Sequence, residues 1–394
     1  MPNMIVDADS HVTEVPDLWT SRMSKKWGDM IPQVRFDEKS GRDCWFAGDK
    51  NFGPIANTAA VRIDETGKLK HVVARLDDAV GIPQIHPSAY DAKERIKVLD
   101  ERGIQAQVLY PNMNFVGEEL HDVVDDPAFK LENIQAYNDW LIEWASEAPD
   151  RLLPIALVPF FDVREAAKEV YRAKELGHRG IAMTGKPQYH GQPFLADRHW
   201  DPLWAAIEEV DLPVNIHLGA GPEGAGGLFN AGRIATEGGM AGAGPRIATE
   251  LFLDNAGSYV DFLNSGILPR FPDLKVVSVE GGMGWVNFVL ESLDFHFKRF
   301  ETLKSRPEFE ELPSFYFHRQ CYVTYWFEQL DPLHVETLGA NNIMFETDFP
   351  HSTSLTPPEM EWAIDVGLGR VPEDVKARVL GLNAAELYGV PVPT

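Results

Sequence analysis

The sequence predicts an α/β protein in which eight buried strands alternate with helices. Three observations predict this class. Short apolar runs recur along the chain, and segments with helical spacing of apolar residues lie between these runs. Prolines or glycines stand at many of the boundaries between a run and the neighbouring helical segment. The runs are apolar almost throughout, which is typical of parallel strands buried on both faces. Eight strand–helix units favour a closed (β/α)8 TIM barrel over an open, doubly wound sheet.

The expected elements begin at residue 4 and end at residue 388, with a long gap after the first strand. The strands are expected at residues 4–9, 105–110, 152–158, 180–184, 213–217, 274–280, 321–326 and 342–346. The helices are expected at residues 91–102, 127–148, 163–176, 202–210, 246–264, 285–300, 331–338, 357–366 and 373–388. Gly103 and Gly177 follow two of these helices, where a glycine C-cap is usual. No G-x-G-x-x-G motif opens a helix after the first strand, which disfavours a dinucleotide-binding fold.

The stretch between the first strand and the first regular helix is long and irregular. Residues 12–95 carry tryptophans, prolines and charged residues without a sustained period. An irregular segment of this length is often functional. We therefore expect a single barrel domain, residues 1–394, with 12–95 as an insertion that contains a small hairpin and lies over the barrel mouth. The glycine-rich residues 219–244 are expected to form a second loop.

No repeat of domain size is visible in the sequence. The pentapeptide Arg-Ile-Ala-Thr-Glu does occur twice, at residues 233–237 and 246–250. Two copies so close together are expected to be a coincidence rather than a structural repeat.

Composition disfavours several classes of function. The chain has 394 residues, of which 44% are hydrophobic, enough for one large core. Its formal net charge of −24 disfavours nucleic acids and anionic membranes as partners, because polyanions would be repelled. Two cysteines, Cys44 and Cys321, indicate a reducing compartment without a disulfide framework. With neither a signal peptide nor an apolar run long enough for a membrane span, a soluble cytoplasmic protein is expected.

Residue types that bind metal ions stand at the carboxyl ends of several expected strands. In a barrel these ends meet at one mouth, where catalytic groups lie. Asp9 and His11 point to the same side of the first strand, because side chains alternate along a strand. The later strand ends supply His217, Glu280, Asp348 and His351. Carboxylates and imidazoles together predict a divalent metal site.

Each of these residues also has an ordinary structural explanation. A single histidine such as His217 is more often part of the core than a ligand. Glu280 and Asp348 could cap a helix or a turn, and His351 could face solvent from a loop. For all of these explanations to hold together at strand ends is less plausible than one shared site, so a metal site is the preferred interpretation.

The motifs around these residues resemble a known family. They are Asp9-Ser10-His11, Asn215-Ile216-His217-Leu218-Gly219, Glu280-Gly281-Gly282-Met283-Gly284-Trp285 and Thr347-Asp348-Phe349-Pro350-His351. They look like the amidohydrolase-related branch of the amidohydrolase superfamily, which includes enzymes similar to aminocarboxymuconate semialdehyde decarboxylase and resorcylate decarboxylase. The resemblance covers nearly the whole chain, because it also includes the motif Tyr110-Pro111 and the segment 383–389 near the end of the sequence.

The resemblance implies a metal-dependent barrel enzyme that holds one or two divalent ions, zinc, manganese or iron. By position, its ligands are Asp9, His11, His217 and Asp348. The opening Asp-x-His replaces the His-x-His or Glu-x-His that is common in the family, which makes this site richer in oxygen. Many decarboxylases of this branch have a catalytic histidine where this chain has Glu280. A carboxylate there is expected to act as a general base or as a further metal ligand.

The main expectation is a metal-dependent hydrolase or non-oxidative decarboxylase that acts on a small aromatic or carboxylated compound. Asp348 is expected to be both ligand and proton shuttle, with Glu280 or His351 as the second acid or base. One alternative places two irons in the same residues, as a diiron oxygenase requires. Another is a non-catalytic binding protein on a decayed barrel. Barrels of this branch often pair, so a homodimer is expected.

Weaker candidates lie outside this set. Arg95 could grip a substrate carboxylate, although a salt bridge on the helix surface is the more usual role. Asp7, one step deeper in the first strand than Asp9, is expected to be structural. The remaining candidates for the wall of the mouth are Lys186, His190, His199, Tyr110, Phe115, Trp285, Tyr325 and Trp326.

Overall fold

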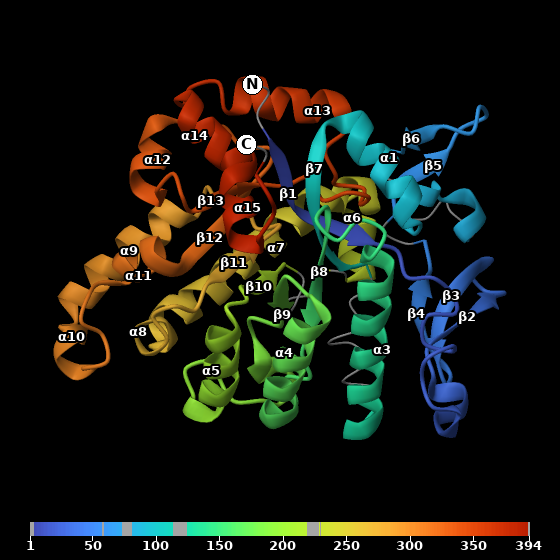
Figure 1. Ribbon diagram of the computed structural model, residues 1–394, viewed down its shortest axis with the longest axis horizontal. Helices are drawn as coiled ribbons and strands as arrows, with labels where there is room; N and C mark the ends of the chain where they lie inside the picture. The colour runs from blue at the N-terminus through green and yellow to red at the C-terminus, as the bar shows by residue number, and fades with distance from the viewer. Residues whose placement is uncertain are drawn as a thin grey trace.

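The computed structural model of this chain describes residues 4–56, 59–72, 81–112, 124–218, 228 and 230–392. Its centre is an eight-stranded parallel sheet, and helices pack around the outside of the sheet (Figure 1). The strands follow one another around the sheet in chain order. They are β1 (Ile5–Val12), β7 (Ile104–Pro111), β8 (Leu152–Leu157), β9 (Gly180–Ala182), β10 (Val214–His217), β11 (Val276–Val279), β12 (Cys321–Tyr325) and β13 (Ile343–Phe345). The predicted (β/α)8 TIM barrel is confirmed.

The first and last strands of the barrel lie side by side at the mouth. Ser10 of β1 forms a parallel bridge to Phe349, which follows β13. The backbone N–H of His11 donates to the carbonyl oxygen of Phe349 at 2.7 Å, and that of Asp348 donates to the carbonyl oxygen of Asp9 at 3.0 Å. Residues from the two ends of the chain are therefore neighbours in the barrel.

The helices predicted between the barrel strands are all present, and the described part of the chain also contains α6, α8, α10 and α11, which were not predicted. Together these helices are α1 (Ala92–Arg102), α3 (Pro127–Ala145), α4 (Val163–Leu176), α5 (Asp201–Val210), α6 (Ala231–Thr236), α7 (Met240–Ser265), α8 (Ile267–Arg270), α9 (Val286–Arg299), α10 (Thr302–Ser305), α11 (Pro313–Gln320) and α12 (Pro332–Leu338). Asp91 and Asp162 cap the amino ends of α1 and α4 through their side chains. Gly103 and Gly177 end the same two helices with φ angles of 68° and 101°, as the C-cap prediction requires. In the described part of the chain, no helix combines the length and the apolar character needed to cross a membrane.

The stretch 12–95 contains more regular structure than the single hairpin expected. Three strands form an antiparallel sheet, two more form a separate hairpin, and short 3-10 helices come before and after these strands. The elements are η1 (Lys25–Met30), β2 (Gln33–Asp37), β3 (Arg42–Ala47), β4 (Lys50–Pro54), β5 (Val61–Ile63), β6 (Leu69–His71), η2 (Ile82–Gln84) and η3 (Pro87–Ala89). β2, β4 and β6 contain no fully buried residue, so they lack the apolar runs that mark the barrel strands, which explains why most of these strands were not predicted.

Aromatic contacts hold part of this stretch to the barrel. Trp27 packs edge to face against Phe129 of α3, with ring centroids 5.3 Å apart, and its indole N–H donates to Glu132 at 2.6 Å. Further along, the backbone N–H of Ala60 donates to the carbonyl oxygen of Pro350 at 2.8 Å, so this segment borders the loop after β13. That residues 12–95 as a whole lie over the mouth stays a prediction.

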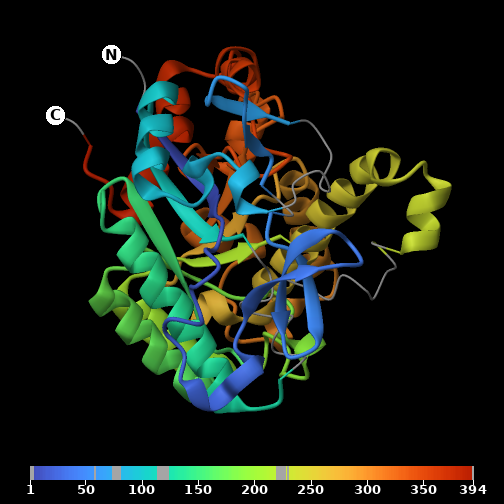
Figure 2. The same cartoon turned by 90° about the vertical axis from the view of Figure 1, so that its right-hand side faces the viewer.

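The helix predicted at 246–264 begins earlier, at Met240, and the expected loop 219–244 contains α6. The helix was expected to start only after the glycine-rich residues 219–244, and proline is unusual inside a helix. In the structure Pro245 lies inside α7. The helix forgoes one backbone hydrogen bond there and gains more than a turn before it. Figure 2 shows α6 and the start of α7, in yellow, projecting away from the barrel.

The two copies of the repeated pentapeptide are joined by ion pairs between their arginines and glutamates; that the repeat is a coincidence stays a prediction. The first copy ends α6, and the second lies in α7. Arg233 pairs with Glu237 at 3.2 Å and with Glu250 at 3.3 Å. Arg246 pairs with the same two glutamates, each at 2.9 Å. A network of four charges contributes more than isolated surface pairs do.

The two helices predicted at the end of the chain each contain a π-helical turn. The segments are α13 (Pro357–Trp362), η7 (Ala363–Gly367), α14 (Glu373–Ala377), η8 (Arg378–Leu382) and α15 (Asn383–Tyr388), of which η7 and η8 are the π turns. A Cβ atom on Gly381 would lie 2.2 Å from the carbonyl oxygen of Met4. Glycine therefore lets the second helix run directly against the start of β1.

Candidate metal centre

The strand that carries Asp9 and His11 is longer than predicted. The expected strand was 4–9, but His11 pairs with Tyr110 of β7 and Val12 pairs with Pro111, so β1 continues to Val12. Asp9 is completely buried and His11 is 2% exposed. Both side chains are therefore held by a strand with neighbours rather than by a free loop.

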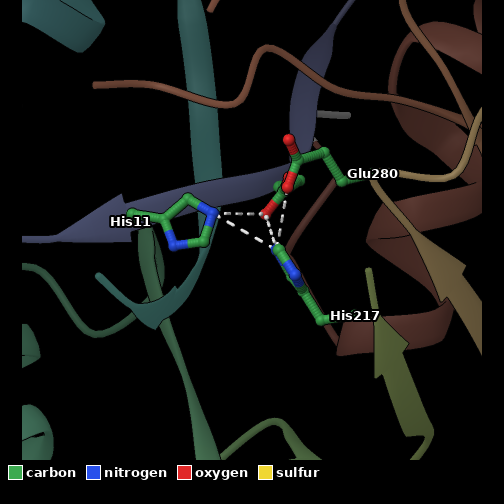
Figure 3. A group of neighbouring side chains, drawn as sticks. His11, His217 and Glu280 are labelled. Carbon is green, nitrogen blue, oxygen red and sulfur yellow. Dashed lines mark hydrogen bonds and ion pairs between the residues drawn. The ribbon is translucent and has the colours of Figure 1, made fainter. Parts of the chain in front are cut away.

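All six residues predicted for the site converge at the mouth. Each of Asp9, His11, His217 and Glu280 offers one ligand atom, and these four atoms lie within 4.8 Å of one another. A second group with the same property consists of His11, Glu280, Asp348 and His351. The cluster is able to hold a divalent metal ion. Figure 3 shows His11, His217 and Glu280 turned toward one point.

His217 occupies the centre of the first group. Its Nε2 atom lies 3.2 Å from Nε2 of His11 and 3.5 Å from both Oδ1 of Asp9 and Oε2 of Glu280. Nε2 of His11 in turn lies 3.5 Å from Oδ1 of Asp9 and 3.4 Å from Oδ1 of Asp348. Two nitrogens and three carboxylates thus share a volume that a single ion could fill.

Backbone carbonyl groups fix the orientation of both histidines. Nδ1 of His11 lies 2.7 Å from the carbonyl oxygen of Pro111, and Nδ1 of His217 lies 2.8 Å from that of Leu218. A carbonyl oxygen only accepts, so each Nδ1 carries the hydrogen and each Nε2 presents a lone pair. Two lone pairs that face each other at 3.2 Å favour a cation between them.

Asp9 provides an independent test of whether the residues fit such an ion. Neither of its carboxylate oxygens accepts a hydrogen bond in the described part of the chain, although both are buried. A buried carboxylate without hydrogen bonds is costly, and such groups usually coordinate a metal or pair with a charge. The mixed nitrogen and oxygen donors suit zinc, manganese or iron. The residues present therefore fit a divalent ion.

Four carboxyl groups crowd into this buried site. Burial raises the pKa of Asp9, and it raises the pKa of Glu280 well above the ordinary value, with the nearby charges of Asp348 and Asp9 adding to the effect. Burial and the charge of Asp9 likewise raise the pKa of Glu346 well above its usual range. A divalent cation would remove this repulsion, because opposite charge favours the ionised carboxylates.

The site shifts the pKa values of His11 and His217 in opposite directions. Burial lowers the pKa of His11 well below its ordinary value, and the neighbouring imidazoles of His351 and His217 lower it further. Burial would also lower the pKa of His217, but the adjacent Asp9 carboxylate outweighs burial and the pKa is raised. The charge of Asp9 therefore has a stronger influence on His217 than on His11.

Two of the site residues have strained backbones. Glu280 has a φ angle of 55° and Asp348 has one of 57°, in the left-handed region that few residues other than glycine adopt. Such a conformation costs about 1–3 kcal/mol and persists only where the surrounding structure enforces it. Both residues lie in the mouth, Glu280 directly after β11 and Asp348 three residues after the end of β13.

His351 and its partners form the second layer of the mouth. Nδ1 of His351 lies 2.8 Å from Oδ1 of Asp348, and its ring stacks on that of His11 at 3.8 Å. Its Nε2 lies 3.0 Å from Oδ1 of Asn112, and the hydroxyl of Thr353 donates to Oδ2 of Asp348. The sequence analysis missed Asn112 and Thr353, because single amides and hydroxyls in loops leave no motif.

Both explanations considered for Arg95 were wrong. It is completely buried, so it is neither a surface residue nor open to a substrate. Its guanidinium donates to the carbonyl oxygens of Ser88 at 2.6 Å and His11 at 2.7 Å, and to Oε1 of Gln107 at 3.1 Å. Arg95 is therefore a structural residue that supports the strand carrying His11.

The other weak candidates lie mostly outside the site. Lys186 forms an ion pair with Asp254 of α7, and His199 is exposed beside Trp200. Neither these two nor His190 belongs to the two groups of ligand atoms described above.

Among the aromatic candidates, Tyr110 is the one beside the histidines. Its ring lies 5.2 Å from that of His217 and 6.1 Å from that of His11. Tyr325 instead donates its hydroxyl to the carbonyl oxygen of Ala363 and belongs to the core. Trp285 and Trp326 show no ring contact to the two histidines among the described residues, and Phe115 lies outside the described residues.

Fold and site together define a class of protein: a parallel barrel with a cluster at its mouth able to hold a divalent ion. The family described as amidohydrolase matches this chain over residues 83–390. The chain therefore belongs to the amidohydrolase family, and the resemblance seen in the sequence is confirmed.

Individual relatives extend this assignment. The gamma-resorcylate decarboxylase of Rhizobium radiobacter is 26% identical over 280 residues, which are 65% of this chain and 76% of that protein. The structure of an amidohydrolase from Mycobacterium avium subsp. paratuberculosis K-10 has a TM-score of 0.74 at 24% identity, over 99% of this chain and 100% of that one. A dihydroxybenzoic acid decarboxylase from Polaromonas sp. JS666, solved with bound manganese and the inhibitor 2-nitroresorcinol, has a TM-score of 0.63 at 18% identity, over 98% and 97%. The two solved structures share the barrel fold.

Proposed function

We propose that this protein is a metal-dependent enzyme that removes carbon dioxide from a small aromatic carboxylate without oxidising it. The observation that carries the proposal is the cluster of Asp9, His11, His217 and Glu280, in which the buried Asp9 carboxylate accepts no hydrogen bond from the described residues. Decarboxylation is favoured over hydrolysis because two of the relatives are a gamma-resorcylate decarboxylase and a dihydroxybenzoic acid decarboxylase.

Asp9, His11, His217 and Asp348 would hold the ion, and Glu280 would serve as a further ligand. When bound, the ion supplies positive charge that binds and polarises the oxygens of the substrate. Manganese is the first ion to test, because the Polaromonas decarboxylase was solved with it. Zinc and iron remain suited to the same donors.

The proposed reaction replaces a carbon–carboxylate bond by a carbon–hydrogen bond, so the site must deliver one proton to the ring. His351 is the proposed donor. Its Nδ1 lies 2.8 Å from Oδ1 of Asp348, and its Nε2 lies 3.0 Å from Oδ1 of Asn112, so each ring nitrogen faces an oxygen. Asp348 would orient the ring and return the proton. Glu280 would act as the second acid or base, in place of the histidine that many decarboxylases of this branch have there.

The test is turnover of 2,6-dihydroxybenzoate by the manganese-loaded protein, with carbon dioxide and resorcinol measured as products. We expect both in equal amounts, and we expect benzoate to react far more slowly because it has no hydroxyl oxygen beside the carboxylate to bind an ion. His351→Ala is expected to lower kcat by about 100-fold or more, since a positioned proton donor is lost. Hydrolysis of amides or esters without release of carbon dioxide from any hydroxybenzoate would contradict the proposal.

A second candidate function, a diiron oxygenase, is supported by the two overlapping ligand groups. They share His11 and Glu280, so the mouth offers enough donors for two ions. Elemental analysis of freshly purified protein separates the candidates. Two irons per chain together with oxygen-dependent turnover would favour the oxygenase, whereas one ion per chain and anaerobic turnover would favour the decarboxylase.

We also propose a homodimer in a reducing, cytoplasmic compartment, with no affinity for nucleic acid. Phe288, Phe295 and Phe300, on and just after α9, are 76%, 62% and 73% exposed, and an apolar face of this kind supports pairing of two copies. Both cysteines are free and buried, which supports the compartment. Light scattering after size exclusion tests the dimer. Phe288→Asp combined with Phe295→Asp is expected to give a monomer.

A further inference from the structure

The turn that carries Glu280 into the site is bonded to a glutamate from the neighbouring strand. Glu328 follows β12, and its Oε1 accepts hydrogen bonds from the backbone N–H groups of Met283 at 2.7 Å and Gly284 at 2.9 Å. Its Oε2 is buried. The two N–H groups stand just before α9, where the helix dipole also favours a negative charge. A single carboxylate therefore satisfies two donors of one turn.

This turn needs support because its backbone is strained. Glu280 and Gly282 have φ angles of 55° and 65°, and the left-handed conformation is unfavourable for a glutamate. Two other bonds hold the first half of the turn. The N–H of Glu280 donates to Oε2 of Glu346 at 3.1 Å, and the indole N–H of Trp285 donates to the carbonyl oxygen of Gly281 at 3.0 Å. The second half depends on Glu328.

The packing around Gly282 shows how closely Glu328 approaches the turn. A Cβ atom added to Gly282 would lie 2.9 Å from Oε1 of Glu328. The carboxylate of Glu328 therefore packs directly against the backbone of Gly282, where a larger residue would be in the way. Among the described contacts, Glu328 bonds to none of the six residues of the metal centre, so any effect on Glu280 must pass through the turn.

We propose that Glu328 is a positioning residue for Glu280. By accepting the N–H groups of residues 283 and 284 it fixes the turn, and the turn holds the Glu280 carboxylate 3.5 Å from Nε2 of His217. The role rests on the proposed function, because it assumes that Glu280 acts at a bound ion. Outer partners that orient a metal ligand typically change metal affinity by about 10–100-fold when they are removed.

The test compares manganese binding by the full-length protein and three variants, by calorimetry and by electron paramagnetic resonance of bound Mn2+. Glu328→Leu removes both acceptors and is expected to weaken binding by about 10–100-fold and to change the resonance of bound manganese. Glu328→Gln keeps an amide oxygen that can accept the same two bonds, so it is expected to retain most of the affinity. This rescue separates acceptor geometry from charge, and it provides a second variant if Glu328→Leu folds poorly.

A matched control replaces another buried glutamate that lies outside the mouth. Glu169 of α4 is 2% exposed and accepts bonds from Asn138 at 2.7 Å and Arg172 at 2.6 Å. Glu169→Leu is expected to lower the melting temperature and to leave manganese affinity unchanged. If Glu328→Leu behaves like this control, Glu328 is merely structural and the positioning role is overturned.

Two further outcomes decide the matter. If Glu328→Gln loses as much affinity as Glu328→Leu, the turn does not depend on the acceptor bonds and the positioning role fails. If the wild-type protein binds neither manganese nor zinc nor iron, the proposed function fails, and the positioning role fails with it. Normal wild-type binding with an unaffected Glu328→Leu overturns the positioning role alone, so the two failures are distinguishable.

Discussion

Asp7 and Asp9 stand two residues apart on β1, both completely buried, yet their hydrogen bonding is opposite. Oδ1 of Asp7 accepts from the N–H groups of Thr347 at 2.7 Å and Asp9 at 3.3 Å. Oδ2 of Asp7 accepts from Nε2 of Gln107 at 2.7 Å and from the hydroxyl of Thr347. Neither oxygen of Asp9 accepts a bond from the described residues. The chain supplies partners to one carboxylate and leaves the other facing two imidazoles.

This difference distinguishes a structural acid from a prospective ligand within one strand. Burial alone does not do so, because it raises the pKa of both groups, that of Asp7 to about 7. What differs is whether the protein itself provides donors for the buried oxygens. Where it does not, an external cation must stabilise the ionised carboxylate.

Replacement of Asp9 should have the largest effect. Asp9→Asn is expected to lower manganese affinity by more than about 100-fold, because losing a ligand should cost at least as much as losing an outer partner. The free energy of unfolding of the metal-free protein should change less than in Asp7→Ala, since Asp9 accepts no hydrogen bond from the described residues. Elemental analysis after dialysis measures the first quantity, and urea unfolding in EDTA measures the second. Full metal content in Asp9→Asn would show that the two aspartates do not differ in role.

Replacement of Asp7 should lower the stability of the protein and leave its manganese affinity nearly unchanged. Asp7→Ala leaves buried donors of Thr347 and Gln107 without an acceptor and is expected to lower the free energy of unfolding by about 3 kcal/mol. Manganese affinity of the folded protein should remain close to that of the wild type. Urea unfolding and calorimetry on the same sample test both parts. A stable Asp7→Ala protein that fails to bind manganese would move Asp7 into the ligand set.

The pH dependence of the metal-free protein should reveal the titration of Asp7. Its pKa rises from 3.8 to about 7 on folding, so the folded protein binds this proton more tightly than the unfolded chain does. Its stabilising contribution is therefore complete below the unfolded pKa and is lost as pH rises through the folded pKa. In EDTA, the wild type should lose about 2–3 kcal/mol of stability relative to Asp7→Asn between pH 5 and pH 8. Parallel stability curves for the two proteins would contradict this.

Asp348 lies between the two cases and should show the smallest effect. One of its oxygens accepts the hydroxyl of Thr353, while the other faces His351 and His11. Thr353→Val removes that single donor and is expected to weaken manganese binding by about 10-fold. Thr353→Ser keeps the hydroxyl and serves as the control. Equal loss in both variants would mean that the methyl group, and not the hydrogen bond, matters.

The site residues could be predicted because they follow from barrel geometry. Alternation along one strand places Asp9 with His11, and the common mouth of a parallel barrel brings His217, Glu280 and Asp348 to them. These inferences need only the order of strands and the residues at their ends.

What escaped prediction depends on contacts between distant segments. Arg95 reads as an exposed helical residue, and only the fold shows that its guanidinium reaches the carbonyl oxygen of His11. Glu328 belongs to no recognisable motif, and its role comes from a hydrogen bond to a turn 45 residues away in the sequence. The start of α7 was misplaced, because the ion pairs that join the α6 segment to α7, Arg233 with Glu250 and Arg246 with Glu237, depend on the fold.

Because β1 and β13 lie side by side, the metal centre can form only after both strands have been synthesised. Asp9 lies on the first strand of the barrel and Asp348 lies just after the last, and the backbone N–H of Asp348 donates to the carbonyl oxygen of Asp9 at 3.0 Å. A nascent chain that ends before residue 348 lacks one wall of the site, and a chain without β1 lacks the opposite wall. Because a metal ion that binds the native arrangement stabilises it, metal uptake would mark the moment at which the barrel is complete. Until then the acids gathered there have no counter-charge.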